Sequence, residues 1–294
     1  AQQHFNVTVA KELKLRLPPR AEQDKIAAVL VGLNDLIANN QRRIALLEST
    51  AEEIYREWFV RMRFPGADRA RFAKGLPLGW ERKNLREVAE VDPLERRRTG
   101  EPAPFVPMDR LSTQSMCFDA DEIRSDWAGA KFRNHDVLLP RITPSLENGK
   151  RGYVLCLNDD EVGVGSTEFI VLRATQISPE HLYFLSISDG FRKHAELSMS
   201  GASGRQRVQD DCFNFFLVAV PPPDVTEAFV QVVRPMFRQV FNLAEQNKRL
   251  SAQRDALLPR LISGKLRAEA LDIQFPPSMQ QPPAEAAQRE AIAR

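Results

Sequence analysis

The chain has 294 residues, of which 43% are apolar and 27% are charged, a composition typical of folded globular proteins. A formal net charge of +2 excludes a protein that holds nucleic acid through overall positive charge, so any such surface must come from local basic clusters. Three cysteines without metal-ligand spacing indicate a reducing compartment. Because the sequence has neither a secretory leader nor a long apolar run, we expect a cytoplasmic protein that does not enter a membrane.

Two matching segments lie near the two ends of the chain. Residues 13–17 and residues 216–220 each have the pattern of a short strand, each ends at a proline pair, and a long helical pattern follows each pair. Proline is tolerated in the first turn of a helix because its missing N–H has no partner there. Residues 1–7 lie as far before the first pair as residues 204–210 lie before the second. We therefore expect residues 1–17 to be the terminal stump of a first domain whose body is missing.

A long helix is predicted over residues 18–62. Its apolar residues recur at alternating steps of three and four, which is the heptad pattern of a coiled coil. About 40 helical residues give a rod about 60 Å long, so we expect its partner to be another long helix. The seam consists of Ile26, Leu30, Leu33, Ile37, Asn40, Ile44, Leu47, Ala51, Ile54 and Trp58.

A β-rich domain is predicted after this helix. Residues 63–78 form a basic linker interrupted by proline and glycine, and from residue 79 to residue 220 the pattern changes to short strands and turns. One helix is expected from Pro179 to about Leu197, with Ser178 as its N-cap. The clearest strands are residues 137–139, 152–155 and 169–172.

A second long helix is predicted over residues 221–268. Its apolar stripe is looser, and Arg254 interrupts it. Asn247 lies in this stripe as Asn40 lies in the first, and a buried asparagine can fix the register of paired helices at a cost in stability. The two asparagines could equally tolerate a hydrated position. The proline-, glutamine- and alanine-rich residues 269–294 predict a disordered tail.

Two polar loops of the domain carry the candidate DNA contacts. Residues 141–151 and 200–207 combine basic, hydroxyl and glycine residues, which can approach phosphates and base edges, although nucleotide sites and solvated loops have the same composition. With two hydroxyl residues at the mouth of a predicted strand, the candidates are Arg141, Thr143, Ser145, Asn148, Lys150, Arg151, Ser166, Thr167, Ser200, Ser203, Arg205, Gln206 and Arg207.

Some of these candidates are stronger than others. Arg205, Gln206 and Arg207 are the best, whereas Thr143 and Asn148 could instead structure their own turn. Glu168 would repel phosphate, so we expect it to position a neighbouring arginine or to accept from a cytosine amine. The aromatic residues Trp58, Phe59 and Trp80 are expected to be packing residues.

Several independent motifs follow one another along the chain. They are residues 18–23 (Pro-Pro-Arg-Ala-Glu-Gln), 54–59 (Ile-Tyr-Arg-Glu-Trp-Phe), 78–80 (Leu-Gly-Trp), 141–150, 165–169 (Gly-Ser-Thr-Glu-Phe), 201–208 and 257–266. In this order, these motifs resemble the specificity subunits (HsdS) of type I restriction-modification enzymes, and the likeness covers almost the whole chain up to about residue 270.

The resemblance implies an α+β fold and a DNA-reading role. A β-rich target-recognition domain, residues 79–220, would be flanked by two conserved long helices, the central one at 18–62 and the distal one at 221–268, which pack as an antiparallel coiled coil. In that family two such domains each read one half of a split site of double-stranded DNA. Two methyltransferase subunits and the restriction/translocase subunits bind the specificity subunit and carry the reactions. We therefore expect this chain to have no catalytic residue, no cofactor and no metal.

Three alternatives stay open. The missing first domain fits a fragment, or a half-subunit that pairs with itself to read a symmetric split site. A stand-alone methyltransferase or nuclease is disfavoured, because the sequence has no glycine-rich cofactor loop and no Asn/Asp-Pro-Pro-aromatic tetrapeptide, and the segment 147–150 has no convincing acidic partner. A coiled-coil adaptor without a DNA role is the third.

Overall fold

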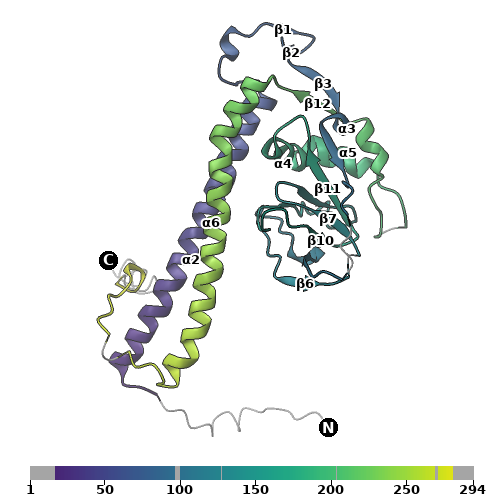
Figure 1. Ribbon diagram of the computed structural model, residues 1–294. Coiled ribbons are helices and arrows are strands. Elements are labelled where there is room, and N and C mark those ends of the chain that lie inside the picture. The colour runs from purple at the N-terminus through teal and green to yellow at the C-terminus, as the bar shows by residue number, and fades with distance from the viewer. Residues whose placement is uncertain (1–16, 97–99, 127, 203, 269–270, 281–294) are drawn as a thin grey trace. The chain divides into compact units, whose positions relative to one another are not determined.

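The computed structural model describes residues 17–96, 100–126, 128–202, 204–268 and 271–280 (Figure 1). The predicted stump at residues 1–17 therefore lies outside the described residues apart from Leu17. The chain divides into two compact units, one made of Ala1–Asn40 with Gln246–Arg294 and the other of Gln41–Glu245. We call them the first and the second unit, and the division falls inside both long helices.

Both predicted long helices are present. Helix α2 (Arg20–Tyr55) begins directly after the first proline pair and continues into the π-helix η1 (Arg56–Val60), and helix α6 (Pro223–Ile262) begins at a proline of the second cluster. Helix α6 ends earlier than the predicted residue 268. Gly264 adopts a φ of +71°, and the N–H of Leu266 bonds the carbonyl of Arg260, which is how glycine closes a helix.

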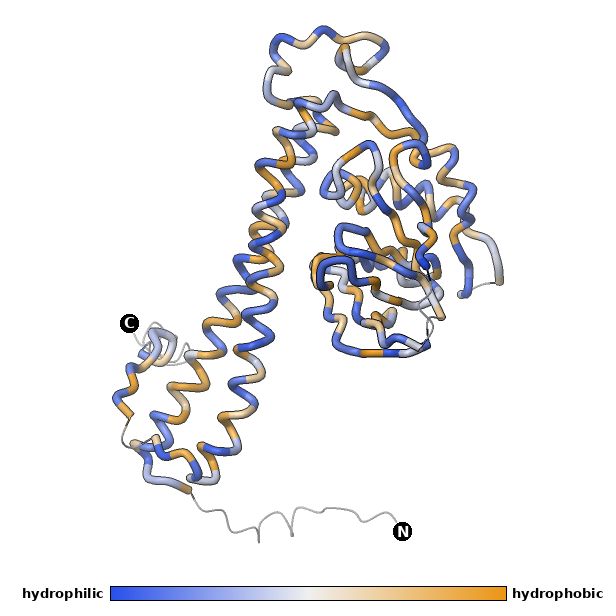
Figure 2. The backbone as a smooth tube through the Cα atoms, viewed as in Figure 1, coloured by the Kyte–Doolittle hydropathy of each residue, from blue (hydrophilic) through white to orange (hydrophobic). Residues whose placement is uncertain are grey.

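In the first unit the two helices lie side by side and run in opposite directions (Figure 1). Ile26 packs with Leu261, and further along α2 the amide of Asn40 lies 3.0 Å from that of Asn247 on α6. Residue numbers thus rise on one helix as they fall on the other. Figure 2 shows apolar and polar segments alternating along both helices, as the heptad pattern predicts.

The tail prediction is wrong for residues 271–280. Ile273 packs against the Ile26–Leu261 cluster, Lys25 donates to the carbonyl of Leu271 at 2.9 Å, and the short helix α7 (Pro277–Gln280) follows. Apolar side chains in this stretch therefore find a helix surface to cover, which composition alone did not reveal. Residues 281–294 lie outside the described residues.

The second unit contains the β-rich domain, built from two four-stranded sheets and two strand pairs. The first sheet has the order β4-β11-β8-β9 and the second the order β6-β5-β10-β7. Among the strand pairs of the described residues, only β5–β10 is parallel. The strands are β1 (Phe72–Ala73), β2 (Leu76–Pro77), β3 (Glu81–Asn84), β4 (Ala89–Val91), β5 (Ala103–Val106), β6 (Glu122–Arg124), β7 (Ala130–Phe132), β8 (Val137–Pro140), β9 (Gly152–Tyr153), β10 (Gly163–Gly165), β11 (Phe169–Ala174) and β12 (Leu217–Val220).

The helices of the domain are short. They are α3 (Leu85–Val88), α4 (Pro179–Ile187) and α5 (Asp189–Leu197), with the 3-10 turns η2 (Ala67–Arg69), η3 (Met108–Arg110) and η4 (Asp210–Asn214). The single helix predicted from Pro179 to Leu197 is two helices, because Ser188 leaves the helical conformation and caps α5 through a hydrogen bond from the N–H of Phe191. Ser178 caps α4 as predicted, accepting from the N–H of His181 at 3.1 Å.

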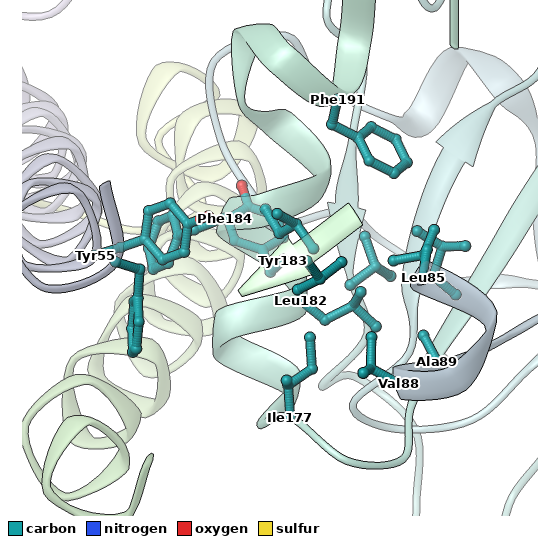
Figure 3. Packing of buried hydrophobic residues seen from close by; sticks show 14 of the residues in the cluster. Tyr55, Leu85, Val88, Ala89, Ile177, Leu182, Tyr183, Phe184 and Phe191 are labelled. Atoms are coloured by element: carbon teal, nitrogen blue, oxygen red, sulfur yellow. The ribbon is translucent and has the colours of Figure 1, made fainter. Parts of the chain in front are cut away.

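One aromatic cluster in the second unit packs the domain against α2 and α6. The ring centroid of Phe59 lies 4.8 Å from that of Phe229 in α6, and Phe59 stacks on His181 of α4 with 4.1 Å between the ring centroids. Figure 3 shows Tyr55 of α2 meeting Phe184 of α4. Trp58 also contacts Phe229, and Trp80 is buried, so the predicted packing role of all three aromatic residues is confirmed.

The fold is α+β, as predicted: a β-rich domain flanked by two long helices. Two buried acids also link elements of the second unit. Glu48 of α2 accepts from Ser115, and Glu180 of α4 pairs with Arg234 of α6 at 2.6 Å. Within the described part of the chain, no helix combines the length and the apolar character needed to span a bilayer.

Candidate nucleic-acid interface

Three loops of the domain meet on one face, and we call them the recognition loops. They are residues 141–143 after β8, residues 166–168 before β11, and residues 200–207 between α5 and η4. The backbone N–H of Thr143 donates to the carbonyl of Gln206 at 3.1 Å, and the N–H of Arg141 donates to that of Glu168 at 2.8 Å. Backbone pairing therefore brings together candidates that lie about 60 residues apart in the sequence.

The third recognition loop is closed at its base by backbone pairing. Ser200 and Arg207 pair through both of their backbone groups, at 3.1 and 2.9 Å. Gly201 closes the turn at a φ of +126°, where a Cβ atom would lie 3.1 Å from the carbonyl oxygen of Arg205. The Arg205 side chain is exposed to solvent. Ser203 lies outside the described residues.

Arg207 is held by Glu168. The guanidinium Nε lies 2.9 Å from one carboxylate oxygen, and a second N–H donates to the other oxygen. The hydrogen bond from Arg207 lowers the pKa of Glu168, and the same contact raises the pKa of Arg207, so both groups are charged. The expectation that Glu168 positions a neighbouring arginine is confirmed. The pair is partly exposed, so one edge of the guanidinium still faces solvent.

The Arg141 side chain supports the recognition loops through contacts with neighbouring segments. Its guanidinium lies 2.6 Å from Asp92 and 3.6 Å from Asp210, and it also donates to the carbonyl of Phe169. Only about a fifth of the side chain is exposed (22%). Arg141 therefore ties the turn after β4 to the start of η4, and little of it can reach a ligand.

The rest of the 141–151 segment divides between solvent and structure. Thr143 is buried and accepts from the N–H of Gln206, Ser145 is half-buried, and Asn148 is exposed. Lys150 donates to the carbonyl of Met108 at 3.1 Å.

Arg151 serves the fold. Its Nε donates to the hydroxyl of Tyr183 at 3.0 Å, and the side chain is half-buried. Together with Lys150 it lines a hollow of about 720 Å³ that Arg56 of η1 and Arg192 of α5 also line. None of the recognition-loop residues lines this hollow.

Of the remaining candidates, Ser166 and Thr167 lie in the second recognition loop. Ser166 is half-buried, and its hydroxyl accepts from the N–H of Glu168 at 3.2 Å, whereas Thr167 is exposed. Gln206 is half-buried in the third loop, and the hydroxyl of Ser200 accepts from Gln209 at 2.7 Å. Thr167 and Arg205 are thus the most accessible candidates on this face, with Arg207 beside them.

The sequence interpretation missed the turn that follows β4. Asp92 in this turn forms an ion pair with Arg141. Glu95 forms ion pairs with Arg133 and Arg173, at 2.6 and 2.8 Å. The turn and Thr167 line a second hollow of about 390 Å³. A signal was present, since residues 96–98 are three consecutive arginines, of which only Arg96 lies within the described residues.

The His, Cys, Asp and Glu side chains are the candidate metal ligands or reactive groups. No cluster of three or more of these side chains among the described residues could hold a metal ion. Burial lowers the pKa of His181 to about 3, so this stacked ring is neutral. Burial also raises the pKa values of Cys117 and Cys212, which keeps both thiols protonated at neutral pH.

Comparisons with known proteins point to one kind of relative, although no family model matches the chain. The MjaIX type I restriction enzyme specificity subunit of Methanocaldococcus jannaschii is 24% identical over 89% of this chain and 62% of its own length. The EcoAI type I restriction enzyme specificity subunit of Escherichia coli is 31% identical over 58% of this chain and 29% of its own length. This chain thus spans less than two thirds of either relative.

A solved structure has the same fold. The S subunit of a type I restriction-modification system from M. genitalium superposes with a TM-score of 0.52, covering 82% of this chain and 61% of that one at 12% identity.

Proposed function

We propose that the chain is a type I restriction enzyme specificity subunit, like the relatives it matches, and that it reads one half of a two-part DNA site. The observation that carries the proposal is the meeting of the three recognition loops on one face of the domain. They gather arginine, glutamine and hydroxyl side chains, which hydrogen-bond to base edges and phosphates.

Within the proposed surface, each residue type has a different task. Arg205, Gln206 and Arg207 would contact base edges, with Glu168 holding the plane of Arg207. The hydroxyl and amide groups would position the backbone of the duplex through phosphate contacts. They are Ser145, Asn148, Ser166, Thr167, Ser200 and Ser203. To Arg141, Thr143, Lys150 and Arg151 we assign support of the loops and of the domain.

The proposed domain organisation follows the same logic. Residues 79–220 would form the target-recognition domain, because its first and last strands, β3 and β12, pair with each other and close it. The helices would be the central (18–62) and distal (221–268) conserved regions, with residues 63–78 as the linker.

We propose that this chain is a non-catalytic subunit in the cytoplasm. Two methyltransferase subunits and the restriction subunits would supply the chemistry, and no cofactor or metal would be needed for recognition. Self-pairing as a half-subunit is the alternative arrangement. The native mass of the complex with the methyltransferase distinguishes the two, because it counts the specificity chains.

The direct test is sequence-specific binding by the complex assembled from this chain and its methyltransferase. Cognate and non-cognate duplexes should be titrated at several salt concentrations, because phosphate contacts make both affinities fall steeply with salt. Arg205→Ala should weaken cognate binding by about 1–3 kcal/mol if Arg205 contacts a base. Arg69→Ala, an exposed arginine of η2, is the control. Equal affinity of the complex for both duplexes would contradict the proposed function.

A further inference from the structure

Leu94 lies in the turn after β4 with its side chain entirely in solvent, at a relative exposure of 101%. A leucine kept in water forgoes about 1.5–3 kcal/mol of burial free energy. Isolated exposed apolar residues are common on protein surfaces, so exposure by itself implies no function. What matters is whether the turn could bury this side chain.

The residues on both sides of Leu94 are fixed. Before it, the Asp92 carboxylate accepts from the N–H of Val171 at 2.8 Å and from Arg141 at 2.6 Å, and Pro93 is buried. After it, the Glu95 side chain is only 7% exposed and accepts from Arg133.

These are charge-assisted hydrogen bonds, and proline restricts the backbone further. The hydrogen bond from Arg133 also lowers the pKa of Glu95, which keeps that carboxylate charged at neutral pH. The turn therefore cannot fold Leu94 inward without breaking ion pairs on both sides. It holds the leucine outward.

Leu94 projects on the face that carries the recognition loops. It lines the hollow of about 390 Å³ together with Thr167 and Arg141. Arg141 joins the two features, because it bonds Asp92 of this turn and, through its backbone, Glu168 of the second loop. An apolar side chain is thus presented in water beside Thr167, which we propose for DNA contact, and beside Arg141, which supports the recognition loops.

We propose that Leu94 contacts the 5-methyl group of a thymine in the major groove and makes this domain select T at that position. This inference rests on the proposed function. In the major groove the thymine methyl is the apolar group that base edges present, so it is the partner that a rigid aliphatic side chain can recognise. The contact would bury on both sides apolar surface that is exposed in the free molecules.

The test begins with the recognised sequence. The complex with the methyltransferase is assembled in cells, and the methylated positions in host DNA give a consensus. If the wild-type complex yields no consensus, the proposed function fails, and that outcome is separate from any result with Leu94. With a consensus in hand, each thymine of the half-site read by this domain is replaced by uracil, which lacks only the methyl group.

A cycle of two changes then isolates the contact. Uracil at one position should weaken binding of the wild-type complex by about three- to tenfold, and Leu94→Ala should weaken binding to the thymine duplex by a similar factor. Combining the two changes should add little, and the Leu94→Ala consensus should relax at that same position. Because Leu94 is fully exposed, the variant should melt at the wild-type temperature.

The matched control is Leu78→Ala, a 60% exposed leucine of the same unit that lies outside the recognition loops. It should leave both the consensus and the effect of uracil unchanged. Two results would overturn the proposal: independent effects of uracil and of Leu94→Ala at every thymine, or a Leu94→Ala complex with unaltered affinity and consensus.

Discussion

At the scale of single residues, the least expected member of the recognition loops is an acid. Glu168 lies where we propose that phosphates approach, and its charge must oppose them. The structure balances this cost with a bidentate contact that fixes the Arg207 guanidinium. Arginine reads guanine best when two of its N–H groups are oriented together, so a fixed plane favours specificity over general affinity.

The Glu168→Gln variant separates these two effects. Loss of the charge should slightly strengthen binding to non-cognate DNA, whereas loosening of Arg207 should weaken cognate binding by about 1 kcal/mol. Titration of the assembled complex with the cognate and the non-cognate duplex measures the ratio of the two affinities. Asp159→Asn, an exposed acid-to-amide change outside the recognition loops, is the control. A rise in both affinities by the same factor would mean that Glu168 acts only by repulsion.

Glu48 illustrates a different use of a carboxylate. Burial raises its pKa above the ordinary value of 4.5, although hydrogen bonds from Ser115 and the N–H of Met116 partly offset the effect. The folded protein therefore binds this proton more tightly than the unfolded chain does. In consequence, the stability contributed by this group is fully present below pH 4.5 and is lost as the pH rises through the raised pKa.

We predict that Glu48→Gln stabilises the protein at pH 7 by about 1 kcal/mol, since the amide oxygen can accept both hydrogen bonds without a buried charge. It should also flatten the dependence of stability on pH above 4.5. Glu48→Ala should instead destabilise by about 1–3 kcal/mol, because it leaves both donors unpaired. Chemical unfolding at several pH values measures both variants. If Gln proves as harmful as Ala at pH 7, the charge itself is required.

At the scale of elements, the two asparagines of the helix seams are the clearest pair. The sequence placed each in an apolar stripe, and the structure joins them: Asn40 donates to Asn247, and Asn247 donates to the carbonyl of Ile37 at 3.4 Å. A polar pair of this kind is satisfied in one alignment of two helices and unsatisfied in neighbouring ones.

The single replacement should therefore lower the free energy of unfolding, whereas the double replacement should restore or raise it. Asn40→Leu alone leaves a partly buried amide without its partner and should lower the free energy of unfolding by about 1 kcal/mol or more. Asn40→Leu with Asn247→Leu should recover or exceed wild-type stability, but it should permit other alignments and self-association. Urea unfolding and sedimentation measure the two properties. Additive losses in the double variant would contradict the pairing.

Sequence patterns predicted some elements well because their causes are local. Heptad periodicity located α2 and α6, and apolar runs located β8 and β11. The break between α4 and α5 was missed, although Ser188-Asp189-Gly190 is itself a capping signal. Sheet order could not be predicted, because it depends on which distant strands pair.

The same reasoning separates what was predictable in the site. Residue types singled out loops that the structure brings together. They did not reveal that Arg141 and Arg151 are supports, since that role comes from Asp92 and Tyr183, which are distant in the sequence. Nor did they reveal Leu94, whose meaning depends on ion pairs that hold its turn.

At the scale of the whole molecule, we expect the long helices to set the distance between half-sites. Seven residues added to α2 after Arg43 and seven added to α6 before Ala244 would lengthen both helices by about 10.5 Å. This equals about three base pairs at about 3.4 Å each. The methylation consensus should keep its half-sites and gain about three base pairs of spacer. An unchanged spacer would exclude the ruler role.

The pairing of β3 with β12 has a consequence for how such proteins diversify. Because the chain enters and leaves the β-rich domain through neighbouring strands, the gene segment between them can be exchanged for another without interrupting either long helix. The exchange is not free of rules. An incoming segment must bring side chains that fit Tyr55, Phe59 and Phe229, which stay behind on the recipient's helices. Natural recombination should therefore vary the recognition loops and preserve the side chains that pack against these three aromatic residues.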